Sequence, residues 1–181
     1  MTLWQNDKRW GSLRLGDGQS TIGHAGCLLT LLCEAASRQA GRTGITPPHA
    51  NEALRKAGAF SGSNLIVELA ARALGMESPA EEKVKGLPGD DKLQIALSGA
   101  LSRGMAIVHV DHDGDGVGNH FILAISMSAM GAKHMYVECT DSALAKTVRL
   151  SWPGLSAQVE WAGVPKTYRA VSVRPLRPLP H

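Results

Sequence analysis

Cys27 has the position in this sequence that best suits covalent chemistry, because it lies between turn-forming residues and an apolar segment. Residues 20–26 are small or turn-forming, and the apolar residues after Cys27 recur at helical spacing, which predicts a helix that begins at the cysteine. The first N–H groups of a helix have no partner within it and favour negative charge. A thiolate is stabilised there, and the thiolate is the nucleophilic form of cysteine. We therefore interpret Cys27 as a nucleophile.

His120 and Asp141 supply the other groups that a cysteine hydrolase needs, a base for the thiol proton and a group that orients this base. His120 stands where a strand is expected to begin, and Asp141 lies just past the end of the next expected strand. Adjacent antiparallel strands can bring two such side chains within hydrogen-bond reach. We predict that His120 acts as general base and acid and that Asp141 orients it, with Glu138 or Asn119 as alternatives for Asp141.

The other cysteines and histidines have ordinary structural interpretations. The chain has three cysteines, an odd count that argues against a disulfide framework. Cys33 and Cys139 are interpreted as core thiols, because free cysteine is among the most buried residue types. The remaining histidines are interpreted as surface or packing residues, with His24 as an alternative lining residue of the cleft.

Length and composition predict one globular domain over residues 1–181. The net charge is +3 and no run of five Lys and Arg occurs, so nucleic acid is not indicated as a partner. The N-terminus lacks an apolar segment of signal-peptide length, and no run is long enough to span a bilayer. We expect no membrane partner and a chain made in the cytoplasm. Action outside the cell then requires delivery by a phage particle, by lysis or by a secretion machine.

The apolar pattern changes from helical spacing to strand spacing near residue 104. Helices are expected over 26–40, 46–57 and 63–73, and from a cap at Asp90 or Asp91 through residue 101, after an irregular arm over residues 1–22. Strands are expected over 105–110, 121–127, 133–139, 146–152, 158–161 and 168–173. Prolines exclude the tail, 174–181, from a central strand. This order predicts an α+β fold with N-terminal helices packed on one face of a C-terminal antiparallel β-sheet.

The order and spacing of several short motifs resemble the papain-like cysteine peptidases of the bacteriocin-processing group and their phage and bacterial relatives. The resemblance covers roughly residues 4–150. The matching motifs are Gln5-x-Asp7-x-x-Trp10, Leu15-Gly16, Thr21-Ile22-Gly23-x-x-Gly26-Cys27, Thr46-Pro47 and Gly118-x-His120-Phe121, with Asp141 after them.

This resemblance implies a papain-like fold, acyl transfer through a thioester, and no cofactor. It also implies a glutamine side chain in the oxyanion hole beside the backbone N–H of Cys27. Gln5 matches the early glutamine of the family, whereas Gln19 lies closer to Cys27 in the sequence and is the alternative. The chain departs from the family at Ser142, where the family usually has proline, and this departure bears on Asp141.

Asp111, Asp113 and Asp115 form the opening of a different motif, the calcium-binding loop D-x-D-x-D-G. The position that should carry the bidentate glutamate of such a loop is Ile122, and its flanks have the pattern of strands. We interpret the segment as a polar hairpin turn that leads to His120, with a weak calcium site as the alternative.

These observations together predict a cysteine hydrolase that cleaves amide bonds. Its substrate is expected to be a peptide or the stem peptide of peptidoglycan, the latter as a phage-associated or secreted antibacterial enzyme. An inhibitor or immunity protein is a further expected class of partner. The alternative is a non-catalytic peptide-binding or phage structural module with the same fold.

Overall fold

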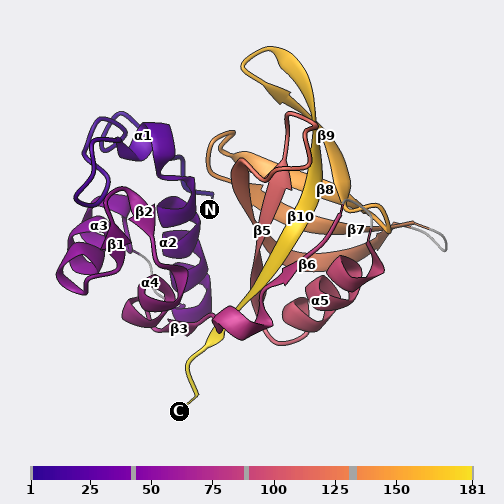
Figure 1. The fold of residues 1–181 in the computed structure, drawn as a ribbon, viewed down its shortest axis with the longest axis horizontal. Helices are drawn as coiled ribbons and strands as arrows, with labels where there is room; N and C mark the ends of the chain where they lie inside the picture. The colour runs from indigo at the N-terminus through magenta and orange to yellow at the C-terminus, as the bar shows by residue number, and fades with distance from the viewer. Residues whose placement is uncertain (1, 42–43, 88–89, 131–133, 181) are drawn as a thin grey trace.

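The computed structural model describes residues 2–41, 44–87, 90–130 and 134–180. Four helices and a short hairpin, all before residue 75, form what we call the helical region (Figure 1). Its elements are α1 (Ile22–Ala25), α2 (Cys27–Ala40), α3 (Pro47–Lys56), β1 (Phe60–Ser61), β2 (Asn64–Leu65) and α4 (Val67–Ala73). The helix expected over 63–73 is therefore shorter, because its first residues pair with β1 instead.

A connecting segment leads from the helical region to a set of long strands. It contains β3 (Met76–Glu77), the 3-10 helix η1 (Ala80–Glu82), β4 (Val84–Lys85) and α5 (Asp91–Leu101). The long strands are β5 (Met105–Asp111), β6 (His120–Met130), β7 (His134–Asp141), β8 (Lys146–Trp152), β9 (Ser156–Trp161) and β10 (Val164–Pro178). The helices expected over 26–40, 46–57 and 91–101 and the strand expected over 146–152 are confirmed.

Strands β5 to β10 close into a six-stranded antiparallel barrel, to which β3 and β4 add along β10. The expected papain-like arrangement of helices on an open sheet is wrong. The barrel closes because β10 is 15 residues long and pairs with β9 through its first part and with β5 through its second part. A strand confined to 168–173, as expected from the sequence, would be too short to join both edges, so the expected strands did not indicate closure.

The C-terminal prolines also take part in the sheet, contrary to expectation. Pro175 lies opposite Ala106 of β5, and Pro178 lies opposite Met76 of β3. A proline fits an antiparallel strand at a position whose N–H would point away from the partner strand. The second half of β10 therefore continues past the point where the prolines predicted its end.

Two clusters of buried apolar side chains follow from the alternation of the strands. On β5, Val108 and Val110 point into the barrel, whereas Met105 and Ile107 point outward and pack with the helical region. Helix α2 lies against β6 in the cluster between the outer wall of the barrel and the helical region. Figure 1 shows the helical region beside the barrel, with α2 on the side that faces it.

None of the described helices combines the length and the apolar character that a membrane crossing requires.

Candidate active site

The first turn of α2 is reached through a close approach between two helices. Gly26 is the N-cap residue of α2 and directly follows α1. A Cβ atom at Gly26 would overlap the carbonyl oxygen of Ile22 and crowd its Cα atom. Only glycine therefore lets α1 turn straight into α2 at this distance. The consequence is a fixed position for Cys27 at the start of a helix of 14 residues.

His120 faces Cys27 from the first position of β6. Its side chain is almost fully buried, and its Nε2 donates a hydrogen bond to Oδ1 of Asp141 at 3.0 Å. The side chain of Cys27 lies close enough to the same imidazole ring to raise its pKa. Because Nε2 is hydrogen-bonded to Asp141, Nδ1 is the ring nitrogen left to exchange a proton with Cys27. The three residues singled out from the sequence thus lie in one chain of contacts.

Asp141 is buried and fully hydrogen-bonded. Its Oδ1 also accepts from the backbone N–H groups of Ala143 at 2.8 Å and Leu144 at 3.1 Å. Its Oδ2 accepts from the hydroxyl of Tyr168 at 2.7 Å. Burial alone raises the pKa of Asp141, but the hydrogen bonds and the charge of His120 outweigh burial and lower it. The carboxylate is therefore ionised at neutral pH.

The ionised carboxylate determines the charge of the imidazole. Burial alone lowers the pKa of His120, but the hydrogen bonds with Asp141 and Cys27 and their charges raise it to about 9. His120 is therefore protonated at neutral pH. A protonated imidazole beside a cysteine side chain is the arrangement expected of a cysteine nucleophile and its acid–base partner.

Aromatic side chains cover the His120–Asp141 pair from the barrel side. The ring of Trp161 meets that of His120 edge-on at a centroid distance of 5.0 Å, and Tyr168 lies at 5.8 Å. His112 stacks on the other side of this group, 5.1 Å from Trp161. Sequence reasoning missed Trp161 and Tyr168, because they reach His120 only through the pairing of β10 with both β9 and β5, and no local spacing indicates that pairing.

Gln5 reaches this site from the N-terminal arm. Its Nε2 donates to the carbonyl of Gly23 at 2.9 Å, and its Oε1 accepts from Oγ of Ser142 at 3.2 Å. The same Ser142 hydroxyl lies 3.4 Å from the carbonyl oxygen of Cys27. An amide nitrogen carries two hydrogens, so one remains for another acceptor. Gln19, the alternative, is exposed.

Ser142 thus has a defined place where the resembling family usually has proline. Besides its hydroxyl contacts, its carbonyl accepts a hydrogen bond from the backbone N–H of Gln5 at 2.9 Å. The serine ties the arm to the residue after Asp141. Its presence therefore does not displace Asp141 from His120.

The alternative orienting residues have other partners. Glu138 binds Arg149 at 3.3 Å, and Asn119 donates to Asp113 at 2.7 Å. Across the described part of the chain, neither hydrogen-bonds to His120. His24 is exposed.

Cys33 and Cys139 have the buried surroundings that the sequence suggested. Both side chains are fully buried. Burial raises the pKa of each thiol, which keeps both in the unreactive neutral form. Cys27, by contrast, is only partly buried.

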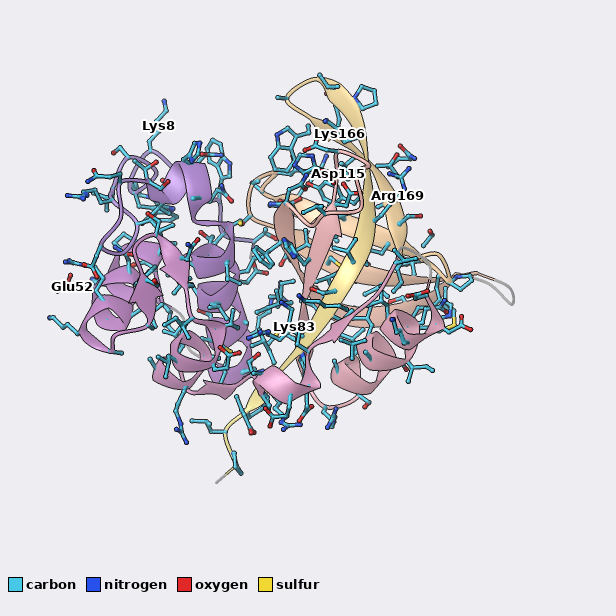
Figure 2. The ribbon with its side chains drawn as sticks, viewed as in Figure 1. Lys8, Glu52, Lys83, Asp115, Lys166 and Arg169 are labelled. Carbon is cyan, nitrogen blue, oxygen red and sulfur yellow. The ribbon has the colours of Figure 1, made fainter. Side chains whose placement is uncertain are left out.

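The carboxylates of the acidic loop face the loop itself. Oδ1 of Asp111 accepts from the N–H groups of Asp113 and Gly114 at 2.9 and 2.7 Å, and its Oδ2 accepts from Gly116 at 2.9 Å. Asp113 also pairs with Lys166 at 2.8 Å, which joins the loop to the β9–β10 hairpin at one end of the barrel (Figure 2). Among the described residues no group of three His, Cys, Asp or Glu is arranged to hold a metal ion. The calcium alternative stays a prediction.

No protein-family model, curated protein or solved structure matches this chain. The resemblance to bacteriocin-processing peptidases accordingly stays a prediction, and the functional argument depends on the geometry of the site.

Proposed function

We propose that the protein is a cysteine hydrolase that cleaves an amide bond through a thioester intermediate. The observation that supports this most directly is the contact of Cys27 with His120 at the N-terminus of α2, together with the 3.0 Å hydrogen bond from His120 to Asp141. A buried imidazole with a carboxylate on one nitrogen and a thiol on the other has the geometry that nucleophilic catalysis requires.

Acylation uses the charged forms of both groups. The thiolate of Cys27 attacks the carbonyl carbon of the substrate, and the carbonyl electron pair moves onto its oxygen. The backbone N–H of Cys27 and the free amide hydrogen of Gln5 stabilise that oxyanion. Protonated His120 gives its proton to the departing amine as the C–N bond breaks. A thioester and a neutral imidazole remain.

Deacylation restores the starting state. Neutral His120 takes a proton from water as the water oxygen attacks the thioester carbon. The C–S bond then breaks, the carboxylic acid leaves, and Cys27 is again a thiolate beside an imidazolium. Asp141 keeps the ring oriented through both steps, and Trp161 and Tyr168 exclude water from the Asp141 side of the ring.

The substrate class proposed is a peptide, with the stem peptide of peptidoglycan as the particular case for an antibacterial enzyme. For that substrate the protein acts in the periplasm or at the cell wall after delivery by a phage particle, lysis or a secretion machine. An inhibitor or immunity protein that covers Cys27 then belongs to the same proposal.

The test is hydrolysis of purified peptidoglycan and of casein, followed by mass spectrometry of the products. We expect the parent protein to release fragments from one of them, and Cys27→Ala to slow this by at least about 100-fold, because nucleophile and acid–base chemistry are lost together. Cys33→Ala is the matched control and is expected to retain the parent rate. If Cys27→Ala hydrolyses either substrate as fast as the parent, the mechanism is wrong.

Iodoacetamide labelling separates an enzyme from a peptide-binding module. Near neutral pH, Cys27 is expected to react far faster than the two buried cysteines, because it is partly exposed and lies beside protonated His120. Equally slow labelling of all three cysteines would favour the non-catalytic module.

A further inference from the structure

A cavity of about 320 Å³ lies between the helical region and the barrel. Leu28 and Glu68 line it from the helical region, Phe121 and Arg174 from the barrel, and Lys83 from the connecting segment. Figure 2 shows Lys83 in the space between the two parts. The volume is at the lower end of the range for ligand pockets, about 300–1,000 Å³, and suits one side chain of a larger substrate.

The cavity lies beside the two elements that carry the candidate active site, one residue along from Cys27 and from His120, neither of which lines it. Leu28 directly follows Cys27, and Phe121 directly follows His120. His109 stacks on Phe121 with a centroid distance of 4.1 Å, and it lies close enough to both Lys83 and His120 to sense their charges. A peptide whose scissile bond lies at Cys27 can therefore place a neighbouring residue in this cavity.

The charges that line the cavity are unequal. Arg174 forms an ion pair with Glu68, and its side chain is 14% exposed. Within the described ranges, no carboxylate lies within ion-pair distance of the ammonium group of Lys83; Glu68 acts on it only at longer range. The cavity thus has two cationic side chains, Lys83 and Arg174, and one carboxylate, Glu68. One positive charge is left without a partner in a partly enclosed site.

The pKa values of two groups at the cavity reflect this excess of positive charge. Burial, with the charges of Lys83, His120 and Lys85, lowers the pKa of His109 to about 4. Burial and the neighbouring Arg174 and Lys85 likewise lower the pKa of Lys83. A negative charge in the cavity would stabilise the protonated forms of both His109 and Lys83. Apolar walls at Leu28 and Phe121 reduce screening of such a charge by water.

We propose that this cavity is a substrate subsite for an acidic residue of the peptide, whose carboxylate binds Lys83 and Arg174. The inference rests on the proposed function, since the subsite adjoins Cys27 as the nucleophile. The preferred substrate is then a peptide with a free carboxylate close to the scissile bond.

The test uses alkylation of Cys27, which does not require turnover. Chloroacetyl tripeptides are made in pairs that differ only by Glu or Gln at each position in turn, and the rate of Cys27 alkylation is measured by mass spectrometry. At one position we expect the Glu peptide to react about 10-fold faster than the Gln peptide, since close charge pairs at an interface can contribute this much. Lys83→Met is expected to bring that ratio near one, and Lys83→Glu to reverse it.

Lys56→Met is the matched control, because Lys56 is an exposed lysine on α3 that pairs with Glu52; it should retain the parent ratio. Iodoacetamide, which is neutral and small, should label Cys27 equally fast in the parent and in Lys83→Met, which shows that the site is intact. A Glu-to-Gln ratio of one at every position in the parent, or a ratio that survives Lys83→Met, overturns the subsite. Slow labelling of Cys27 by every reagent overturns the proposed function instead.

Discussion

Asp141 controls the charge of the imidazole in the candidate active site. It accepts hydrogen bonds from His120, Tyr168 and two backbone N–H groups, so its negative charge persists although the side chain is buried. The raised pKa of His120 follows from that charge and from the contact with Cys27. The alkaline limit of activity should therefore depend on Asp141.

Asp141→Asn is expected to move the alkaline limb of the rate profile to lower pH. The parent should lose activity as the pH rises through about 9, because His120 is then deprotonated and cannot protonate the leaving amine. Without the carboxylate, burial is left to lower the pKa of His120, so the imidazolium is lost at lower pH. We also expect kcat/KM at neutral pH to fall by about 10-fold or more, a part of the roughly 10²–10⁴-fold that acid–base catalysis contributes.

Tyr168→Phe is the control for this change, since it removes one hydrogen bond to Asp141 but keeps the carboxylate. Its effect should be confined to about 1.5–3 kcal/mol of stability, as for a hydrogen bond to a charged group, and a small shift of the pH profile. An Asp141→Asn enzyme with the parent profile would show that Asp141 does not orient His120.

At the residue level, side-chain type and the expected strand ends sufficed to select Cys27, His120 and Asp141, which the structure brings together. Gln5 came from the resemblance alone, because its approach to Gly23 and Ser142 depends on the path of an arm without regular structure. Tyr168 could not be found, because its contact with Asp141 requires a closed barrel.

Two short connections between elements position Cys27 and His120 in the candidate active site, and each contains one residue on which its shape depends. Gly26 permits the close approach of α1 to α2. Asp111 binds three backbone N–H groups of the loop that leads to His120. Substitutions there should act on activity through the placement of Cys27 or His120.

Gly26→Ala is expected to reduce activity more than stability. The added Cβ cannot fit against Ile22 without a shift of α1 or of the first turn of α2, and either shift moves Cys27 relative to His120. Misplacement by about 1 Å can cost about 100-fold in rate. The measurement is kcat together with the unfolding midpoint in urea. Gly99→Ala within α5 is the control for stability, since Gly99 has a helical backbone and a Cβ there meets no atom within 4 Å. Parent activity in folded Gly26→Ala would show that the close approach of α1 to α2 does not place Cys27.

Asp111→Ala is expected to destabilise the loop whether or not calcium is present. It leaves three backbone N–H groups without their acceptor, and hydrogen bonds to a charged group contribute about 1.5–3 kcal/mol each, less where water replaces them. Because both oxygens of Asp111 already accept bonds from the loop, 1 mM CaCl2 should leave the thermal midpoint of the parent unchanged relative to EDTA. A rise in that midpoint with calcium, absent from Asp111→Ala, would instead support the calcium site.

At the level of the whole molecule, strand patterns predicted most elements but not how they close. Residues 146–152 alternate clearly and form β8 as expected. For β10, the prolines in its second half predict an end at residue 173, five residues before the strand ends. Closure depends on the length of that one strand and on its pairing with both β9 and β5. Local preferences do not encode the pairing of β10 with β5, because it joins residues 58 to 71 positions apart.

The second half of β10 also joins the barrel to the helical region. Leu176 pairs with Met105 of β5 and is fully buried in the cluster that contains α2. Leu176→Ala should therefore lower the free energy of unfolding by about 2–5 kcal/mol, the usual cost of such a truncation in a core. The neighbouring Arg177 pairs with Glu77 and Glu82 at the surface, and Arg177→Ala should cost about 1 kcal/mol or less. Urea unfolding of both variants measures the difference; equal, small effects would show that the C-terminal segment is not part of the core.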